Sequence, residues 1–119
     1  MARKLPPPFG YATATAITTA PDGTVSVRYH ATDVATRHSD GSMTLRSGGW
    51  RTVTTKRRIN QALEFFGILA HVYQRRHEWY VAPYGADGIE FHDGMTVRLD
   101  GPQIVPVERE AERMMRAAS

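Results

Sequence analysis

One segment of the chain has the apolar spacing of a helix, whereas apolar residues elsewhere mostly alternate with polar ones. This contrast constrains the fold more than any other feature of the sequence. The apolar positions of that stretch follow the i, i+3, i+4, i+7 spacing of one helix face: Ile59, Ala62, Leu63 and Phe66. Thr55 is a natural N-cap before them, and Gly67 is placed as a C′ stop after them. The sequence therefore predicts one central helix near residues 55–66, set among strands.

The first strands are predicted by a turn signal, Pro-Asp-Gly, at residues 21–23. The proline pre-sets the first corner of a turn, and the glycine adopts a positive φ without strain. A three-residue loop there places Ile17 opposite Val27 and Thr19 opposite Val25, with both pairs on one face.

The next hairpin is predicted around an Asp-Gly dipeptide at residues 40–41, which is typical of two-residue hairpin loops. Such a loop pairs His38 with Met43 and Thr36 with Leu45, and this pairing matches the apolar alternation of the two strands. Together with the preceding strand, the segment is expected to form a β-meander.

Alternation with a period of two returns after the helix. Residues 69–75 and 78–83 are expected to form a hairpin closed near residues 76–77. Trp79 shares a face with Val81 in this hairpin, so we expect its indole in the core.

A last hairpin is predicted from residues 88–92 and 95–99. A three-residue loop over residues 92–94, with its glycine left-handed, puts Ile89 opposite Val97 and keeps the apolar side chains together.

These elements predict a single domain of the α+β class, and 119 residues is an ordinary size for one domain. We expect a mainly antiparallel, twisted sheet of six or seven short strands, with one packed central helix and a C-terminal helix. Residues 1–10 are expected to form a flexible arm, residues 11–106 the α+β domain, and residues 107–119 the terminal helix. The central helix is expected to pack on a set of strand residues: Val27, Leu45, Val72, Trp79, Val81 and Val97.

The strongest functional signal is a basic block between the predicted meander and the helix. Residues 46–60 contain five Lys or Arg residues, no acidic residue and a Gly-Gly-Trp run. A helix N-terminus presents unpaired N–H groups and a partial positive charge, so added cations there favour a bound anion. The candidate anion- or nucleic-acid-binding residues are Arg46, Trp50, Arg51, Thr54, Thr55, Lys56, Arg57, Arg58 and Asn60.

The same block is also explained without any ligand, as a strand-to-helix corner. In this interpretation the two glycines turn the chain, Trp50 plugs the core and Thr55 caps the helix. The cations then form only a solvated face of the protein.

A second candidate surface combines aromatic rings with cations: Tyr73, Arg75, Arg76 and Tyr80. Bases of single-stranded nucleic acid stack on such rings, and nearby arginines neutralise phosphates. Aromatic residues are also favoured in strands for packing alone, so both interpretations stay open.

The sequence shows no catalytic or metal-binding motif. It contains no cysteine, and its five histidines lack a usual metal-ligand spacing. We therefore expect no metal site, no cofactor and no catalytic residue, in a protein that is not an enzyme. A small metal-independent nuclease remains an alternative, because acid–base catalysis needs only two suitable groups brought together by the fold.

The run Ser47–Asn60 follows the pattern Gly-Gly-Trp-Arg-Thr-x-Thr-Thr-Lys-x-Arg-Ile-Asn after its first serine. With Asp40–Leu45 before it and Phe91–Met95 after it, this run resembles a widespread group of uncharacterised small proteins of tailed phages and prophages. The resemblance extends over residues 25–99. It implies an origin in a mobile element and a role in binding, and it carries over no catalytic residue.

Charge and resemblance together favour an anionic partner. The net charge of +3 and the isoelectric point of 9.6 suit a polyanion. We expect nucleic acid or a nucleotide as the partner, with a homo-oligomer compatible with either. The alternative is a protein–protein inhibitor of a host factor or defence system. No apolar run is long enough to span a bilayer, so we expect no membrane partner and a location in the host cytoplasm.

Overall fold

The computed structural model describes residues 3–107, which contain one helix and nine strands. Four strands precede the helix: β1 (Thr15–Thr19), β2 (Val25–Tyr29), β3 (Thr32–Arg37) and β4 (Met43–Leu45). The helix is α1 (Val53–Phe65). Five strands follow it: β5 (Ala70–Arg75), β6 (Glu78–Pro83), β7 (Ile89–Glu90), β8 (Met95–Asp100) and β9 (Gln103–Pro106).

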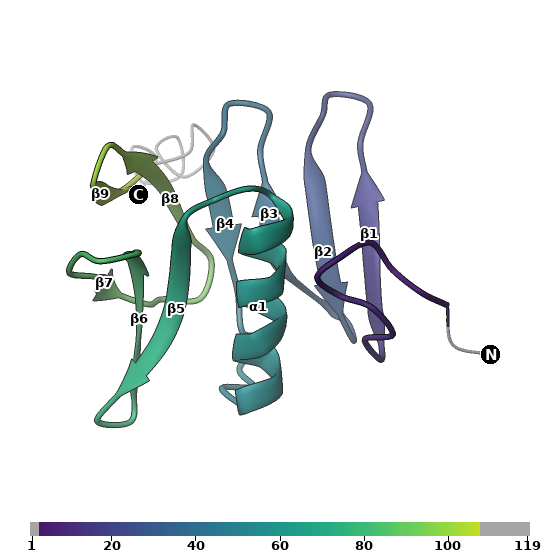
Figure 1. Ribbon diagram of the computed structural model, residues 1–119, viewed down its shortest axis with the longest axis horizontal. Helices are drawn as coiled ribbons and strands as arrows, with labels where there is room; N and C mark the ends of the chain where they lie inside the picture. The colour runs from purple at the N-terminus through teal and green to yellow at the C-terminus, as the bar shows by residue number, and fades with distance from the viewer. Residues whose placement is uncertain (1–2, 108–119) are drawn as a thin grey trace, which may run out of the picture.

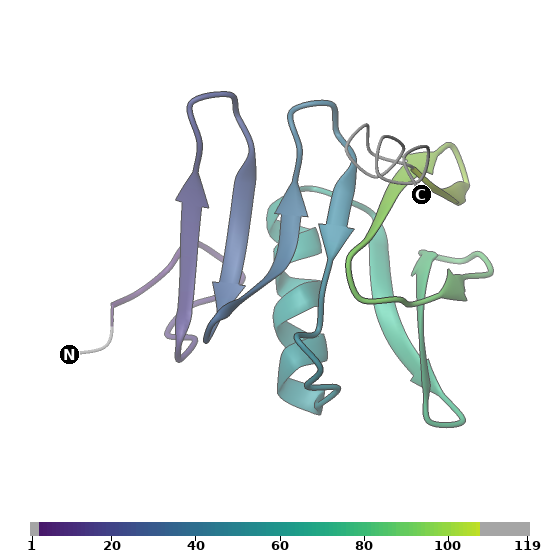
Figure 2. The same ribbon diagram turned by 180° about the vertical axis from the view of Figure 1, so that it is seen from behind.

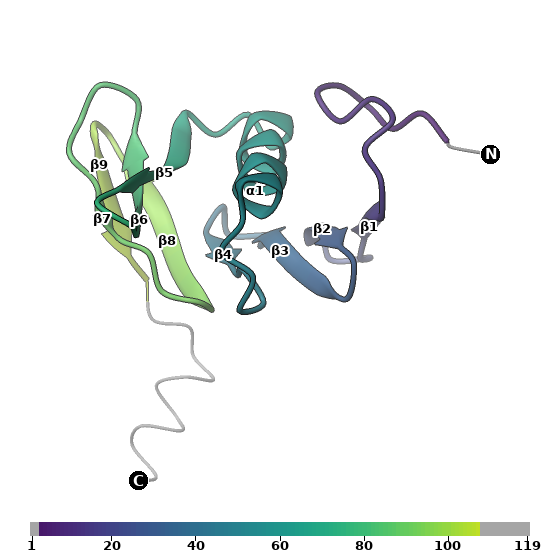
Figure 3. The ribbon, with the colours of Figure 1, turned by 90° about the horizontal axis from the view of Figure 1, so that it is seen from below.

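The strands form two antiparallel sheets around α1. Six strands pair in the order β1-β2-β3-β4-β8-β9, and three pair in the order β5-β6-β7. In Figure 1, β2 lies to one side of α1, β3 runs behind the helix, and β5 lies to the other side. Figure 3 shows α1 over one face of the larger sheet, whose far strands β8 and β9 stand beside β6 and β7. The α+β class is confirmed, but the predicted single sheet of six or seven strands is wrong, because α1 separates β5 from the strands that precede it.

The register of the first hairpin is confirmed. Ile17 pairs with Val27 and Thr19 pairs with Val25 across β1 and β2. Beyond Val27, the pairing with β3 shifts at a β-bulge that turns Val34 toward the core. The two buried valines therefore anchor the meander on the same face as α1.

The predicted register of the β3–β4 hairpin is wrong by one residue. His38 N–H donates to Ser42 O at 2.8 Å, and Gly41 N–H donates to His38 O at 2.9 Å, so the loop contains three residues and not two. Ala35 therefore faces Leu45, where Thr36 was expected. A left-handed glycine closing a three-residue loop explains the shift, since it leaves one more residue outside the ladder.

The predicted hairpin of residues 88–92 and 95–99 is also wrong. Phe91 N–H donates to Trp79 O at 2.9 Å, which draws β7 onto β6. Gly94 N–H donates to Leu45 O at 2.8 Å, which draws β8 onto β4. The predicted tight turn with a left-handed Gly94 is present, but it carries the chain from one sheet to the other.

The core forms where both sheets meet α1. Ile59, Ala62 and Leu63 are fully buried, and Phe66 packs against the same cluster. The six strand residues expected to contact this stripe all belong to that core: Val27, Leu45, Val72, Trp79, Val81 and Val97. The predicted end of the helix is confirmed as well, since Gly67 N–H donates to Glu64 O and Ile68 N–H donates to Leu63 O.

The proline-rich N-terminal segment is attached to the domain through Phe9. Its side chain is 4% exposed and packs edge-on against Phe65, with ring centroids 5.6 Å apart. Gln61 donates to Pro8 O at 3.3 Å. At the other end of the chain, the expected C-terminal helix lies outside the described residues.

Candidate nucleic-acid interface

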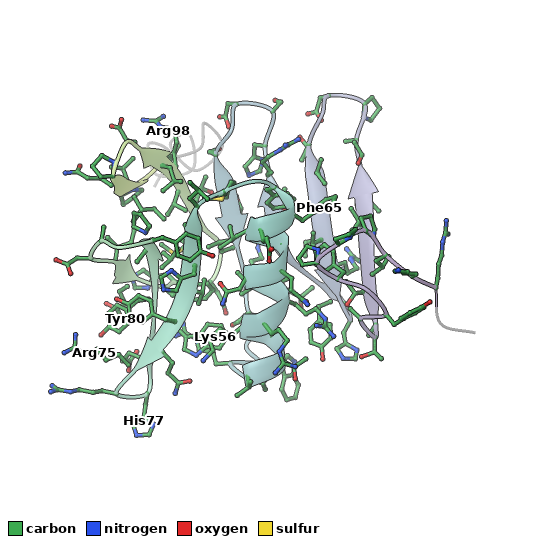
Figure 4. All side chains as sticks on the ribbon, in the orientation of Figure 1. Lys56, Phe65, Arg75, His77, Tyr80 and Arg98 are labelled. Carbon is green, nitrogen blue, oxygen red and sulfur yellow. The ribbon has the colours of Figure 1, made fainter. Side chains whose placement is uncertain are left out.

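Asn60 fixes the position of α1 against β5. Its side-chain nitrogen donates to Val72 O at 2.9 Å, and its side-chain oxygen accepts from Val72 N–H at 2.7 Å. Since the chain runs along α1 and returns along β5, the first turns of α1 lie beside the last residues of β5 (Figure 4). Lys56 Nζ accordingly lies 3.5 Å from Gln74 Oε1. The basic block and the aromatic hairpin are thus neighbours at one end of the molecule, and Asn60 is the residue that aligns them.

The helix begins earlier than expected, so its N-cap is Thr52 and not Thr55. Thr52 Oγ1 accepts from Thr55 N–H at 3.1 Å, and the two hydroxyls are 3.0 Å apart. Thr55 is buried in the first turn, where Thr54 is half-buried. Both Thr52 and Thr55 can cap a helix, and the chain uses Thr52, whose hydroxyl oxygen accepts the Thr55 N–H. Lys56 therefore starts the second turn, and its cation is not at the helix end.

The three adjacent cations of α1 point in different directions, because successive helix residues are rotated by about 100°. Lys56 lies over the Trp79 ring, with Nζ 6.0 Å from its centroid. Arg57 is exposed. Arg58 is only 8% exposed on the opposite flank, where Nε donates to Thr15 Oγ1 at 3.1 Å and Nη1 donates to Gln61 Oε1 at 2.9 Å. Two of these three predicted ligands face the hairpin or solvent, and Arg58 is a packing residue.

Arg51 extends the cationic surface toward β6 and β7. Its guanidinium carbon lies 5.1 Å from the Phe91 ring centroid and 5.6 Å from that of Trp79. Its Nη2 donates to Phe91 O at 3.4 Å. Lys56 and Arg51 therefore hold two positive charges against the same buried indole.

Trp50 does not plug the core, as the ligand-free interpretation supposed. Its side chain is 71% exposed, whereas Trp79 is 1% exposed and fills the core instead. The indole lies beside a cavity between the β2–β3 turn and the loop that joins β4 to α1, residues 46–52, which we call the corner loop. Arg46, at the start of that loop, is exposed.

The corner loop is held by Asp93, which the sequence pattern marks only as a turn residue. Its Oδ1 accepts from Ser47 N–H at 2.5 Å, and its Oδ2 accepts from the Ser47 hydroxyl at 2.9 Å. Partial burial raises the pKa of the Asp93 carboxyl, but hydrogen bonds from Ser47 and Gly49 and the nearby charge of Arg51 outweigh it, so the pKa lies below its ordinary value. The hydrogen bonds from Ser47 to the charged Asp93 carboxylate therefore fix the loop without a ligand.

All four residues of the predicted stacking surface meet around one cavity of about 320 Å³ on the outer face of the β5–β6 hairpin: Tyr73, Arg75, Arg76 and Tyr80. Tyr73 and Tyr80 are cross-strand partners, and their rings stack with centroids 5.5 Å apart. Asp87 and Gly88 complete the wall. A Cβ at Gly88 would lie 2.7 Å from Val81 O, so the glycine lets the loop close on β6.

Two further rings continue this face and were absent from the predicted set. His71 stacks on Tyr84, with centroids 5.1 Å apart and planes within 8°, and it lies 5.4 Å from the Tyr73 ring. Among the described residues, the His71 Nδ1 is the one buried side-chain polar atom without a hydrogen-bond partner. The period-two spacing of His71 and Tyr73 could have indicated a shared face.

Within residues 3–107, no group of three His, Asp or Glu side chains is arranged to hold a metal ion. Lys56 and Arg51 contact the β5–β6 hairpin from the side of α1, and Arg75 and Arg76 lie at its tip. In Figure 4, Lys56, Arg75 and His77 lie in the lower half of the view, and Arg98 lies at the opposite end.

Comparison with known proteins places the chain in a family. The model of the Kyanoviridae Gp96 protein family matches residues 9–98. No curated protein and no solved structure matches. In the part of the chain that is described, no helix has both the length and the apolarity needed to cross a membrane. Since the family model covers all but the two ends of the sequence, the chain belongs to the Kyanoviridae Gp96 protein family, a family of phage proteins.

Proposed function

We propose that this phage protein binds single-stranded nucleic acid at the tip of the β5–β6 hairpin. The observation that carries the proposal is the 320 Å³ cavity whose walls include two tyrosine rings and two arginines. Single-strand binders combine ring faces, on which bases stack, with cations that follow the phosphates. The cavity supplies both kinds of group within one opening.

Charge around the tip supports an anionic partner. Lys56 and Arg51 flank the hairpin on its inner side, and Arg75 and Arg76 stand at its end. Three acidic residues lie nearby: Glu78 is the cross-strand partner of Arg75, Glu90 is that of Tyr80, and Asp87 lines the cavity. The strand backbone would follow the arginines and lysine, so affinity should fall steeply with added salt.

Asp87 gives the cavity an acceptor among its donors. A carboxylate in a wall that also contains ring faces accepts hydrogen bonds from exocyclic amino groups of bases. The proposal therefore includes a preference for strands containing cytosine, adenine or guanine over strands of uracil or thymine, which lack an exocyclic amino group.

The proposed surface contains fewer residues of the basic block than the nine candidates that the sequence suggested. Arg58 and Asn60 have internal partners, and their replacement would act through stability. The exposed Arg57 and the half-buried Lys56 stay in the proposed surface.

The test is a titration of fluorescently labelled single strands with the purified full-length protein, followed by anisotropy. The double variant Arg75→Ala/Arg76→Ala should bind more weakly and show a shallower dependence on salt, by about 0.7 units of log–log slope for each phosphate that is no longer neutralised. Tyr73→Ala should lower affinity by about 1–3 kcal/mol if one base stacks there. Arg98→Ala, an exposed arginine at the other end of the molecule, is the matched control.

Equal affinity of Arg75→Ala/Arg76→Ala, Arg98→Ala and the unaltered protein would overturn the proposal. So would the absence of binding at low salt. A complex with a protein that survives high salt would instead support the alternative of an inhibitor of a host factor.

A further inference from the structure

We infer that a second cavity, beside Trp50, binds a neutral heterocyclic base, either as a free nucleoside or as one unpaired base of a strand. The cavity has a volume of about 410 Å³, which lies within the range of small-molecule sites. Its walls come from the β2–β3 turn and from the corner loop with the first turn of α1. Figure 2 shows the turn and the loop at the same end of the molecule as the start of α1. None of the residues that line this cavity lines the hairpin cavity, so the inference does not depend on the function proposed for the hairpin.

The walls are held in place without a ligand. On one side, His30 has a φ of 55°, a conformation that side-chain-bearing residues rarely adopt, and its ring lies 4.4 Å from that of Tyr29. On the other side, Gly48 approaches Thr32 so closely that a Cβ there would lie 2.3 Å from Thr32 Oγ1. Since Asp93 clamps the neighbouring Ser47, both walls meet at a fixed contact. The cavity is therefore preformed, which lowers the cost of binding.

The aromatic side chains of the cavity suit a planar ligand. Tyr29, His30 and Trp50 contribute three rings to the lining, and Val34 contributes an apolar surface. The indole of Trp50 is 71% exposed, an unusual position for the largest apolar side chain. A base stacked on that indole would remove apolar surface from water on both partners, and such stacking contributes about 1–3 kcal/mol per base.

Hydroxyl groups supply the polar contacts. Thr32, Thr52 and Thr55 line the cavity together with Ser47. The Ser47 hydroxyl is already bonded to Asp93 and Gly49. The Thr52 and Thr55 hydroxyls share one hydrogen bond, and Thr52 Oγ1 also accepts from Thr55 N–H. Since a hydroxyl has one donor and two acceptor positions, the two threonines keep part of their capacity for a ligand. Groups that both donate and accept match the mixed edges of a base and the hydroxyls of a ribose.

The lack of charged side chains in the lining favours the neutral base of a nucleotide over its phosphate. Among the described residues, no Lys, Arg, Asp or Glu lines this cavity. Arg58 lies behind Tyr29, 5.4 Å from its ring centroid, and is bonded to Thr15 and Gln61. A phosphate would find no cation inside, whereas an uncharged base loses little on leaving water for a cavity of rings and hydroxyls.

The first experiment is an NMR titration of the indole N–H signals at high salt, where phosphate contacts are screened. The protein has two tryptophans, and Trp50→Phe identifies the signal of each. The four ribonucleosides and a neutral disaccharide are the probes. At least one nucleoside should shift the Trp50 signal and leave that of the buried Trp79 unchanged.

Two variants identify the site. Trp50→Ala should weaken nucleoside binding about tenfold or more, since loss of about 1.4 kcal/mol of stacking is a tenfold change. Thr32→Val, which keeps the side-chain shape and removes its hydroxyl, should weaken it less. Arg98→Ala, an exposed position that lines neither cavity, is the control and should leave the nucleoside-induced shift of the Trp50 signal unchanged.

A second arm separates the two sources of the base. An oligonucleotide with one 2-aminopurine should change its fluorescence on binding, and Trp50→Ala should remove that change, if the cavity takes a base within a strand. A response to free nucleosides alone supports the small-molecule form. Failure of both arms, or an equal shift of Trp50 with the disaccharide, would overturn the inference, and neither result bears on binding at the hairpin.

Discussion

At the scale of single residues, the corner loop depends on a glycine that permits close approach. Gly48 has a φ of 68°, and its backbone lies against the Thr32 side chain. Gly49 next to it has a φ of 83° but faces open space. The two glycines look equivalent in the sequence and differ only in what surrounds them.

Gly48→Ala should therefore destabilise the protein more than Gly49→Ala. Both variants place alanine in the left-handed region, at a cost of about 1–2 kcal/mol. Gly48→Ala adds a clash with Thr32, which brings the expected loss to about 2–4 kcal/mol. Urea denaturation followed by tryptophan fluorescence measures both.

The double variant Gly48→Ala/Thr32→Ala serves as a further check, because it removes two of the three Thr32 atoms that the new methyl group would meet, Oγ1 and Cγ2, and leaves Cβ at 3.1 Å. It should recover part of the missing stability, which is a coupling between the two sites. Equal destabilisation by the two single variants would contradict the close approach of Gly48 to Thr32.

Asp93 shows that a carboxylate beside a tight turn can also hold a distant loop. Its hydrogen bonds to Ser47 favour the charged form and lower the pKa of its carboxyl. For a lowered pKa, the stabilising contribution is present above the unfolded pKa, near about 3.9 for Asp, and is lost as the pH falls through the lower folded pKa.

Asp93→Asn should thus lower the free energy of unfolding at neutral pH by about 1 kcal/mol, a modest value because the side chain is largely exposed. The difference from the unaltered protein should shrink below about pH 4. Urea denaturation at several pH values measures it. Asp87→Asn, at another exposed carboxylate, is the control, and a difference that stays constant with pH would contradict the explanation.

At the scale of elements, the position of α1 against β5 depends on one side chain. Asn60 satisfies both the N–H and the carbonyl oxygen of Val72, which is buried within β5. An asparagine in the middle of a helix has a poor helix propensity, so its presence there needs such a reason. In the sequence it follows three cations, which is why the pattern alone placed it in the anion site.

Asn60→Ala should destabilise the fold by about 2–4 kcal/mol, because it leaves two backbone groups of Val72 without partners. The affinity of the folded variant for nucleic acid should stay unchanged. Thermal unfolding and the anisotropy titration measure the two properties separately.

Arg57→Ala is the matched comparison on the same helix, and it should lower the affinity for nucleic acid while leaving the stability nearly unchanged. Its side chain is exposed, so stability should change by less than about 0.5 kcal/mol. If Asn60→Ala lowered the affinity while remaining as stable as the unaltered protein, the structural role assigned to Asn60 would be wrong.

At the scale of the whole molecule, two sheets and one helix share a single core. Buried residues from α1, from β2–β4 and from β5–β6 belong to one cluster. The apolar faces of both sheets pack on α1 and on each other (Figure 3). The two sheets should therefore unfold together.

Leu63→Ala tests this cooperativity, because Leu63 is fully buried in α1 between the sheets. The variant should be less stable by about 2–5 kcal/mol. Tryptophan fluorescence in a Trp50→Phe background, where only Trp79 of the smaller sheet remains, and far-UV circular dichroism should shift to the same new midpoint. Separate midpoints would show that the two sheets unfold independently.

Features that depend on neighbours along the chain could be predicted from the sequence. The apolar stripe of α1, its stop at Gly67, the first hairpin register and the burial of Trp79 all follow from periodicity and turn chemistry. The grouping of Tyr73 and Tyr80 with the adjacent arginines was also predictable, since strand pairing brings a short hairpin together.

Two features depend on the packing of the whole chain: which distant segments pair with each other, and where each cation points. β7 and β8 belong to different sheets because of backbone hydrogen bonds to Trp79 and to Leu45. Both bonds are long-range interactions, which local periodicity does not report. Arg58 became internal and Arg57 stayed in water because the packing around α1 differs from flank to flank. Periodicity shows that a face will be buried, but the partner of that face depends on the whole arrangement of helix and sheets.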